Sequence, residues 1–505
     1  MVKELVEKHE DKFHRFFEMV PGLLTWGVLL SPVWLGRIAP QVVVFFLTFL
    51  AIFWVYRAFI HLVGVVVGYR RYNRESKVDW LSEIQNLWGF EHLKHLVIIP
   101  AVSESYEVLE GTFSSIADQD YPQDKIFVAF SVEEKNAKRI LKDVKKIKKK
   151  FGKRLGTVWT FVHPRGLPGE AVGAASNRTW AAKRAVEKIK ELGFETDDFL
   201  MTTLDADMRF HPQFLARLSR AFLTDPERKN KFFQTAVYLF DNNLWDVPPL
   251  MRIQANSITL AVLSSWVIEP DRKDTWSCYS VPLTTLMETG YWDTSLGVDD
   301  TPFYWRTLIK KEGNFEGHHF YVPVYADAVQ DEGFIKTHVS QYKQLLRWGW
   351  GVITFPIAMK GFLTTKMSLS LKLSKLYHLL EQYTIWRTVT FLITFGFLLL
   401  TLANPDIRLT SAGYRLPKIT GVILTTAFIF LVPLTFLRSK ISSNIPSGWP
   451  WWKRVWAWVE GPLVILNLLT YTFIPYIDAE TRLMLGKRLE FWPTPKVREQ
   501  KEDGV

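Results

Sequence analysis

The sequence decides its fold at Phe199-Leu200-Met201-Thr202-Thr203-Leu204-Asp205-Ala206-Asp207, where a strand-like run of six residues leads into two aspartates. The run predicts a buried strand that ends at Asp205. Ligands of open α/β sheets bind outside the carboxyl ends of the strands, where both aspartates would lie. Two carboxylates can hold a hard divalent cation together with the phosphates of a ligand. The alternative is a solvated turn that only ends the strand.

The chain before this stretch alternates short strands with helical patterns. Residues Leu96–Pro100 and Ile126–Phe130 read as two buried strands, and Glu107–Ala117 reads as the helix between them. A strand, a helix and a strand in this order predict a parallel sheet with crossover helices. A basic helix over Lys135–Phe151 and a strand over Val158–Val162 continue the alternation. These elements predict an α/β domain that binds a nucleotide.

The composition indicates a globular domain combined with membrane spans. The chain has 505 residues, of which 48% are hydrophobic, and its mean hydropathy is near zero. The formal net charge of +11 fits a cytoplasmic face that follows the positive-inside rule and attracts anionic lipid. No nucleic-acid-binding motif accompanies the charge, so we expect no nucleic-acid partner. The single cysteine, Cys278, excludes an internal disulfide and a cysteine-rich metal site.

Apolar segments at the start of the chain are candidate spans. Residues Val2–Met19 read as a charged amphipathic helix, and their mixed charges do not fit a cleavable signal peptide. Residues Pro21–Gly36 read as a short span or as a re-entrant or interfacial piece. Residues Val42–Gly68 form a clearer span. The arginines that follow it, Arg70, Arg71 and Arg74, place its end in the cytoplasm.

The second half of the chain adds further candidate spans. An amphipathic, tryptophan-rich stretch from Gln344 to about Phe362 predicts a helix in the membrane plane. Spans are then expected over Ile385–Ala403, Ile419–Leu437 and Trp456–Tyr476. Counting from a cytoplasmic Gln344 places the C-terminus outside, but the basic tail over Arg482–Lys501 favours the inside. Either one segment is re-entrant or the interfacial stretch hides another crossing.

A second acidic pair lies in Val298-Asp299-Asp300. A carboxylate whose pKa is lifted by burial or by a like-charged neighbour can serve as a general base, and Asp299 would be such a neighbour for Asp300. The alternative is a helix N-cap, because the Thr301-Pro302 that follows also suits a helix start. Both interpretations can hold at once.

A third motif is Gln344-Leu345-Leu346-Arg347-Trp348. On a helix, Gln344, Arg347 and Trp348 share one face. A guanidinium binds phosphate through its planar fork, and an indole offers a flat surface to a sugar ring. The alternative is an interfacial helix whose Arg and Trp only anchor at lipid headgroups.

These three motifs, in this order, resemble the membrane-embedded synthases of glycosyltransferase family 2, which include cellulose, chitin and hyaluronan synthases. The resemblance covers about His95–Trp348, with weaker similarity at Leu485–Arg488. The family usually has Thr-Glu-Asp where this chain has Val298-Asp299-Asp300, so the base position is kept as Asp300.

The resemblance implies a role for each matched residue. Asp300 would be the catalytic base, and Asp205 and Asp207 would bind a metal ion, Mg²⁺ or Mn²⁺. The nucleotide sugar would contact Glu104, Glu133, Asp205, Gln344 and Arg347. The acceptor would contact Trp348, Cys278 and Asp299, although Cys278 also suits a small buried hydrophobe.

The chain departs from the family pattern in two places. The family has a Gly-Lys-x-x-Ala-x-Asn loop, whereas here Gly169-Glu170 opens the loop and Ser176-Asn177 closes it, with two extra residues and no lysine. Arg165 and Arg178 are the candidates to replace the missing cation. Where the family has paired aspartates near the nucleobase of the donor, this chain has Glu133-Glu134.

The sequence therefore predicts a GT-A-type α/β nucleotide-sugar-binding domain inserted among transmembrane and interfacial α-helices. The predicted parts are an N-terminal helix with transmembrane segments over 1–75, a cytosolic GT-A-like glycosyltransferase domain over 76–340, interfacial amphipathic helices with the Gln-x-x-Arg-Trp motif over 341–383, C-terminal transmembrane helices over 384–480, and a basic tail over 481–505.

The expected function is that of a multi-pass membrane enzyme with a cytoplasmic catalytic domain. It would polymerise sugar from a nucleotide-sugar donor, expected to be a UDP-sugar, into a polysaccharide, with inversion and with export across the cell membrane. Its partners would be the donor, a glycan or lipid acceptor, and membrane lipids. One alternative is transfer of a single sugar to a polyprenyl phosphate or glycolipid. Another is a non-catalytic scaffold or transporter with a degenerate transferase domain.

Overall fold

The computed structural model describes residues 2–489, 492 and 494–496, and the chain forms two compact units. The described residues of Met1–Val67, Pro248–Ile268 and Gln341–Leu489 form the first unit. Those of Gly68–Val247, Glu269–Ser340 and Glu490–Val505 form the second. A helix from the middle of the chain, Pro249–Ile268, belongs to the first unit, and the described residues of the tail belong to the second.

The second unit contains a mixed seven-stranded sheet in the order β3-β2-β1-β4-β8-β6-β9. Its strands are β1 (Lys94–Ala101), β2 (Ile126–Glu133), β3 (Thr157–His163), β4 (Phe199–Thr203), β6 (Lys231–Thr235), β8 (Ser280–Pro282) and β9 (Glu316–Phe320). Strand β1 pairs in parallel with β2 and β4, so that Val97 lies opposite Val128 and Thr202. Strand β8 pairs antiparallel with β4 and β6. The predicted strands and their parallel pairing are confirmed.

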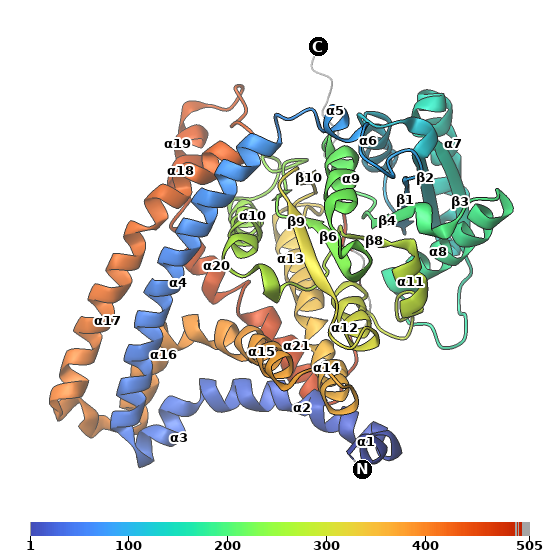
Figure 1. Ribbon diagram of the computed structural model, residues 1–505. Helices are drawn as coiled ribbons and strands as arrows, with labels where there is room; N and C mark the ends of the chain where they lie inside the picture. The colour runs from blue at the N-terminus through green and yellow to red at the C-terminus, as the bar shows by residue number, and fades with distance from the viewer. Residues whose placement is uncertain (1, 490–491, 493, 497–505) are drawn as a thin grey trace. The chain divides into compact units, whose positions relative to one another are not determined.

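The parallel strands form because their residues suit a sheet that is covered on both faces. Every residue of β1 after Lys94 is buried, and the run is almost continuously apolar, as parallel strands between helices usually are. The crossover helices are α6 (Tyr106–Ala117), α7 (Ala137–Phe151) and α8 (Ala174–Glu191), and α8 packs on β1, β2 and β3 (Figure 1). Helix α7 buries Ile140, Val144 and Ile147, as the helical spacing predicts.

Gly156 marks a close approach between two backbone segments at the start of β3. Its φ is +65°, and a Cβ added there would lie 2.4 Å from the carbonyl oxygen of Ile126 and 2.5 Å from that of Gln123. Gly152 has a similar φ of +57°, but a Cβ added there would have no neighbour within 4 Å. The two glycines therefore share a backbone conformation and differ in the space around them.

We expect Gly156→Ala to lower the free energy of unfolding more than Gly152→Ala does. Positive φ costs each alanine about 1–2 kcal/mol. Only the alanine at 156 also overpacks its neighbours, which adds about 1–3 kcal/mol. The midpoints of thermal unfolding of the two purified variants check this difference. Equal midpoints would mean that the backbone can move away from a Cβ at 156 at no cost.

A small second sheet and further helices complete the second unit. The sheet has the order β5-β10-β7, with β5 (Arg209–Phe210), β7 (Tyr238–Leu239) and β10 (Val324–Tyr325). The helices are α5 (Trp80–Ile84), α9 (Phe214–Thr224), α11 (Leu283–Thr289) and α12 (Asp300–Lys310). Helix α9 packs on β6 and β9, and α12 begins at the second predicted acidic pair.

The first unit is helical. Its helices are α1 (Val2–Lys8), α2 (Glu10–Leu29), α3 (Ser31–Ile38), α10 (Pro249–Ile268), α14 (Thr354–Thr364), α15 (Leu369–Leu380), α16 (Trp386–Ala403), α17 (Ser411–Ile429), α18 (Leu431–Ile441), α19 (Trp451–Val459), α20 (Leu463–Leu469) and α21 (Ile474–Met484). Helices α4 (Pro40–Glu75) and α13 (Phe334–Gly349) run from one unit into the other. The boundary of the predicted domain at 76–340 therefore encloses α10, which belongs to the first unit.

Three helices among the described residues are long and apolar enough to cross a membrane. They are Pro40–Glu75, Leu369–Ala403 and Ser411–Ile441. Two further pairs qualify only if each bent pair is one span: Glu10–Leu29 with Ser31–Ile38, bent by 59°, and Trp451–Val459 with Leu463–Met484, bent by 54°. The length and apolar composition of these helices are consistent with a membrane protein.

The bent pairs refine two sequence expectations. The segment Pro21–Gly36 is interrupted at Leu30, which agrees with a broken span or a re-entrant piece. The expected span over Trp456–Tyr476 is not one straight helix. It is interrupted between Val459 and Leu463, where Gly461-Pro462 follows Glu460, because proline cannot donate the backbone hydrogen bond that a helix interior needs.

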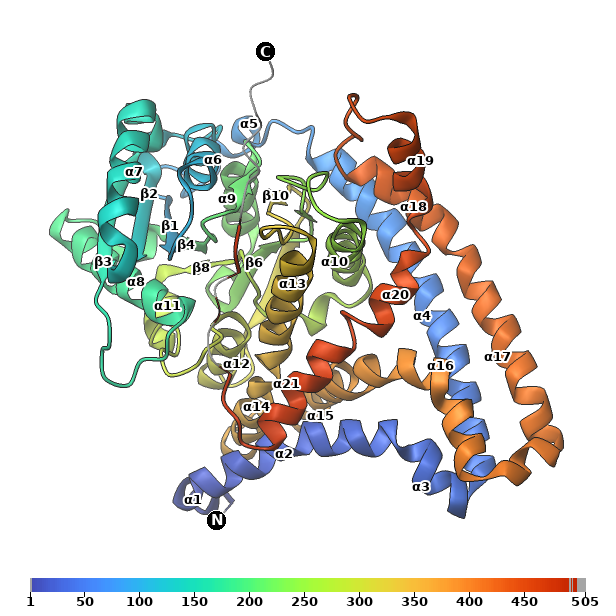
Figure 2. The ribbon, with the colours of Figure 1, turned by 180° about the vertical axis from the view of Figure 1, so that it is seen from behind.

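An apolar core joins three of the long helices. Buried side chains of α4, α16 and α17 form one cluster, and α4 and α16 lie side by side in both views (Figures 1 and 2). The buried members of the cluster are Val43, Val44, Leu47, Leu50, Val389, Leu392, Leu400, Ile407 and Leu416. This contact between segments far apart in the sequence gives the first unit a core of its own.

Candidate functional site

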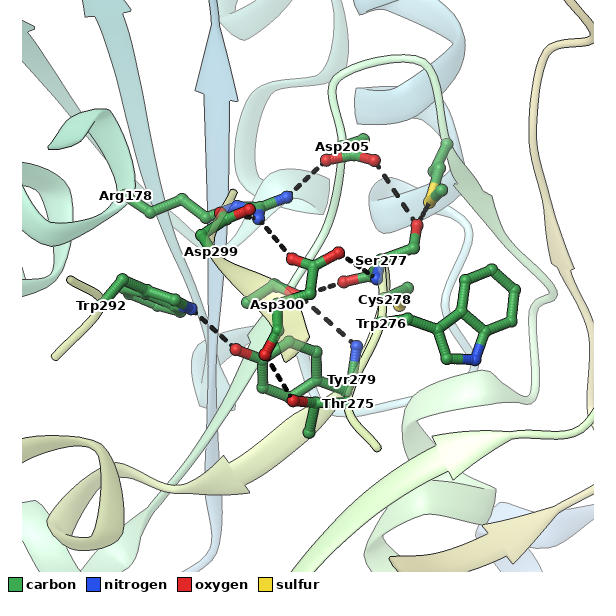
Figure 3. A network of polar contacts seen from close by, with 12 residues as sticks. Arg178, Asp205, Thr275, Trp276, Ser277, Cys278, Tyr279, Trp292, Asp299 and Asp300 are labelled. Atoms are coloured by element: carbon green, nitrogen blue, oxygen red, sulfur yellow. Dashed lines mark hydrogen bonds and ion pairs between the residues drawn. The ribbon is translucent and has the colours of Figure 1, made fainter. Parts of the chain in front are cut away.

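Arg178 lies at the centre of a carboxylate network in the second unit. Its Nη2 donates to Asp205 Oδ1 at 2.5 Å, and its Nη1 donates to Asp299 Oδ2 and, at 3.0 Å, to Asp300 Oδ1. Figure 3 shows the guanidinium between Asp205 on one side and the Asp299–Asp300 pair on the other. The side chain of Arg178 is only 2% exposed. One buried cation therefore joins two acidic motifs that are almost a hundred residues apart in the sequence.

The sheet topology brings these residues together. Asp205 follows the last residue of β4 by two positions, and Arg178 lies in the first turns of α8, which packs on the neighbouring parallel strands. Asp299 precedes α12 and Asp300 begins it. The carboxyl ends of parallel strands share one edge of a sheet, which is where an α/β domain binds ligands. The predicted helix start at Asp299 is confirmed, but its carboxylate bonds Arg178 and makes no capping hydrogen bond.

A tight loop holds the Asp300 carboxylate from the other side. The backbone N–H of Ser277 donates to Asp300 Oδ2 at 2.6 Å, and Ser277 has a φ of +50°, which non-glycine residues rarely adopt. The hydroxyl of Thr203 on β4 donates to the carbonyl oxygen of Ser277 at 2.7 Å and fixes this conformation. Strained backbone of this kind concentrates at functional sites. The sequence motifs did not single out Ser277, although it is adjacent to Cys278, which was predicted to contact the acceptor.

The environment of Asp300 suits a base. Burial raises its pKa well above the ordinary value, and the charge of Asp299 raises it further. The Arg178 guanidinium, the partner of all three aspartates, acts in the opposite direction. When ionised, the three carboxylates of the network carry three negative charges against the single positive charge of Arg178. The network therefore favours further positive charge nearby, which a proton or a bound cation can supply.

Asp207, the second residue of the strand-end pair, lies outside this network. It is 5% exposed, its Oδ2 accepts from the backbone N–H of Asp327 at 3.4 Å, and its Oδ1 forms an ion pair with Lys496. Across the part of the chain that the structure describes, no group of three or more His, Cys, Asp or Glu residues is arranged to hold a metal ion. Two carboxylates still fit a Mg²⁺ or Mn²⁺ ion that takes its other ligands from phosphates and water. The Lys496 ammonium at Asp207 is a stand-in cation that supports this fit.

The two glutamates predicted to bind the nucleotide have other partners in the second unit. Glu104 Oε2 accepts from the backbone N–H groups of Val102, at 2.7 Å, and Ser103, at 3.0 Å. Burial raises the pKa of Glu104, although its own backbone N–H, the charge of Lys496 and the backbone N–H of Val102 oppose the rise. Glu133 lies 3.2 Å from Nδ1 of His163. Neither glutamate belongs to the Arg178 network, and their nucleotide contacts stay predictions.

His163 links Glu133 to the loop that departs from the family pattern. Its Nε2 lies 2.9 Å from Glu170 Oε2, and its ring is nearly buried. Burial alone would lower the pKa of His163, but the hydrogen bonds and charges of Glu133 and Glu170 outweigh burial and raise it. A protonated His163 would therefore bridge two carboxylates and hold the loop to the end of β2.

Asn177 and the two arginines considered in place of the family's loop lysine have different surroundings. Asn177 donates to the carbonyl oxygens of Ala101 and Ser131, and so joins the ends of β1 and β2. Arg178 places its charge among the aspartates, as described above. Arg165 is exposed, and its backbone N–H donates to Glu134. Of the two arginines considered, Arg178 is the one that lies at the acidic motifs.

The predicted acceptor residues differ in accessibility. Asp299 is bonded to Arg178, whereas Cys278 is 1% exposed, and burial raises the pKa of its thiol. The carbonyl oxygen of Cys278 accepts from the hydroxyl of Tyr238 at 2.5 Å. These contacts favour the interpretation of Cys278 as a small buried hydrophobic residue over the interpretation that its sulfur contacts an acceptor.

The Gln-x-x-Arg-Trp motif lies on α13, at residues that belong to the first unit, and the predicted helix is confirmed. Gln344 Oε1 accepts from Gln341 Nε2 at 3.4 Å, Arg347 is half-buried, and Trp348 is 38% exposed. Nearby on the same helix, the hydroxyl of Tyr342 donates to Asp478 Oδ2 at 2.8 Å and ties α13 to α21. The roles of Gln344, Arg347 and Trp348 toward a ligand stay predictions.

No protein-family model and no curated protein matches the sequence. The structure is similar to the mannosyltransferase PcManGT from Pyrobaculum calidifontis, solved in complex with GDP-Man and Mn²⁺, with a TM-score of 0.43, 16% sequence identity and coverage of 88% of this chain and 100% of that one. It is also similar to S. aureus TarS 1-349, with a TM-score of 0.37, 14% identity and coverage of 78% and 92%. TarS 1-349 in complex with UDP-GlcNAc gives 0.34, 14%, 78% and 93%. All three TM-scores are below 0.5.

Proposed function

We propose that this protein is a membrane-bound inverting glycosyltransferase that polymerises sugar from a nucleotide-sugar donor into a polysaccharide. The observation that carries the proposal is the joining of Asp205, Asp299 and Asp300 by the buried Arg178. It joins Asp205, the first residue of the acidic pair at a strand end, to Asp300, a carboxylate whose pKa is raised. Transfer from a nucleotide sugar needs both a binding site for the charged diphosphate and a base for the acceptor hydroxyl.

The chemical step follows from the position of Asp300. Its carboxylate removes the proton from an acceptor hydroxyl, and the oxygen attacks C1 of the donor sugar. The new bond forms between that oxygen and C1 while the bond from C1 to the phosphate oxygen breaks, and the electron pair leaves with the nucleoside diphosphate. Attack opposite the leaving group inverts the configuration at C1. The raised pKa makes Asp300 a stronger base than an ordinary aspartate.

The leaving diphosphate needs positive charge near the end of β4. Asp205 and Asp207 would hold Mg²⁺ or Mn²⁺, which when bound supplies Lewis-acid neutralisation of that charge. Arg178 orients Asp205, because their ion pair fixes one of its two oxygens. Of the Gln-x-x-Arg-Trp motif, Arg347 would contact the diphosphate, Gln344 the donor and Trp348 the acceptor sugar. The donor we favour is a UDP-sugar.

The long apolar helices support a role at the membrane. Three of them are long enough to span, and the positive charge that follows the first span favours a cytoplasmic catalytic domain. A polymer made in the cytoplasm needs a route out, so we propose that synthesis is coupled to export. Membrane lipids and a growing glycan are then the partners of the helical unit.

A donor screen on the full-length protein tests this proposal. The protein, purified in detergent, is incubated with nucleotide sugars and Mg²⁺ or Mn²⁺, and both the released nucleotide and the size of the product are measured. We expect turnover of one donor and a product of many sugar units. If the product is a lipid that carries one sugar, the protein transfers single sugars and does not polymerise them. Absence of turnover with every donor would favour a scaffold or transporter.

A further inference from the structure

We propose that Lys496 is a tethered cation that neutralises Asp207 and competes with the divalent cation for the strand-end site. The inference rests on the proposed function, because it assigns regulation to the same acidic site. Binding of the metal ion would displace Lys496 from Asp207. The empty enzyme would thus hold its acidic site closed with a charge from its own chain.

The first observation is the ion pair itself. Nζ of Lys496 contacts Oδ1 of Asp207, which is almost fully buried, while Lys496 keeps 21% of its side chain exposed. The other oxygen of Asp207 accepts from the backbone N–H of Asp327. The Lys496 ammonium therefore contacts Oδ1 of Asp207, the carboxylate oxygen to which the backbone N–H of Asp327 does not donate. A lysine in this position neutralises a carboxylate that would otherwise be buried with no cation beside it.

The second observation is the backbone contact that places the lysine. Lys496 forms an isolated parallel bridge with Gln330 of the same unit. Gln330 is itself fixed, because its Oε1 accepts from Nδ2 of Asn243 at 3.1 Å and Asn243 also bonds the backbone of Ala328. The lysine is thus delivered to Asp207 by a segment that pairs with a buried, hydrogen-bonded part of the domain.

The third observation is the acidity around the ammonium. A lysine amine is ordinarily positively charged at neutral pH, and the carboxylates of Asp207, Asp327 and Asp205 all attract the charge of Lys496. The same ammonium also attracts the charge of Glu104. Four carboxylates therefore interact electrostatically with the Lys496 ammonium. Two of them, Asp205 and Asp207, are the pair we assign to the metal ion.

Competition follows from the charges. A divalent cation and an ammonium a few ångströms apart repel each other at a cost in free energy, even at the dielectric constant of water. Both cannot lie on Asp207 without that cost. The ion pair with Lys496 must therefore weaken metal binding at Asp207, and metal binding must weaken the ion pair between Asp207 and Lys496.

Mn²⁺ binding to the full-length protein tests the proposal. We expect Lys496→Met to bind Mn²⁺ more tightly than the wild type by on the order of tenfold, as measured by titration with electron paramagnetic resonance of the free ion. Lys496→Arg keeps the charge and should bind Mn²⁺ like the wild type. The matched control is Lys229→Met, which removes an exposed lysine paired with Asp197, and it should change nothing. Equal or weaker Mn²⁺ binding by Lys496→Met would overturn the proposal.

Chemical labelling of the wild type supplies a readout that needs no variant. Acetylation of lysine amines, quantified by mass spectrometry, should increase at Lys496 when Mn²⁺ is added without donor and should stay constant at Lys229. Unchanged or decreased labelling at Lys496 would overturn the proposal even if Lys496→Met failed to fold. Tighter Mn²⁺ binding by Lys496→Met in a protein that turns over no donor would sink the proposed function and leave this inference standing. Donor turnover with unchanged Mn²⁺ binding would do the reverse.

Discussion

Replacement of Asp300 by Asn is expected to lower donor turnover by roughly 10²–10⁴-fold, which is the usual contribution of a general base. The fold should survive, because Asn can still accept a hydrogen bond from Arg178 or from the backbone N–H of Ser277, the two donors that hold the carboxylate. What Asn lacks is the ability to take a proton from the acceptor hydroxyl. Released nucleotide, measured at saturating donor, gives the fold-change.

The wild type should also show the base in its pH profile. Because burial and Asp299 raise the pKa of Asp300, activity should fall as pH drops through a value above the ordinary aspartate pKa of about 3.9. Asp300→Asn should lose this acidic limb. The matched control is Asp197→Asn, an exposed aspartate paired with Lys229, whose turnover should equal that of the wild type. Wild-type turnover in Asp300→Asn would show that another group is the base.

Replacement of Arg178 by Met is expected to have the largest effect on stability. The substitution leaves Asp205, Asp299 and Asp300 close together without the cation that joins them. Removing one partner of a buried ion pair costs about 3–5 kcal/mol, since the remaining charge stays buried. Thermal unfolding of the purified variant measures this loss. Arg184→Met, on the same helix, removes an exposed partner of Glu187 and should cost less than about 1 kcal/mol.

A double variant separates the role of Arg178 as a cation from its role in packing. Asp299→Asn removes one of the charges that Arg178 neutralises, so adding it to Arg178→Met should restore part of the lost stability. Arg178→Met should also raise the pKa of Asp300, because it removes the positive charge that lowers this pKa, and the acidic limb of any residual activity should move to higher pH. A variant as stable as the wild type, with an unmoved limb, would contradict the central role of Arg178.

The sheet was largely predictable because its signal is local. Short apolar runs such as Leu96–Pro100 lie within strands that are buried on both faces, and their hydrophobicity alone marks them. The strand before Asp205 and the helix that begins at Asp300 were marked in the same way by adjacent residues. The segment around Glu460-Gly461-Pro462 was harder to predict, because hydropathy over a window does not register a proline that interrupts the helix.

The partners within the site were not predictable, because they depend on contacts between distant segments. The sequence marked Asp205 and Asp300 separately, but nothing local indicates that Arg178 would join them. Ser277 acts through its backbone N–H and an unusual φ, which residue type does not encode. Lys496 was assigned only to a basic tail that bears on topology, whereas its ion pair with Asp207 arises from the folded path of the chain.

The measurement that tests the central claim most directly is nucleotide release in the donor screen, compared between the wild type and Asp300→Asn. If the carboxylate network joined by Arg178 is a sugar-transfer site, the wild type releases the nucleoside diphosphate of one donor, a chelator of divalent cations stops the release, and Asp300→Asn shows almost none. Absence of release from every donor by the folded wild type, or equal release by the variant, would contradict the account.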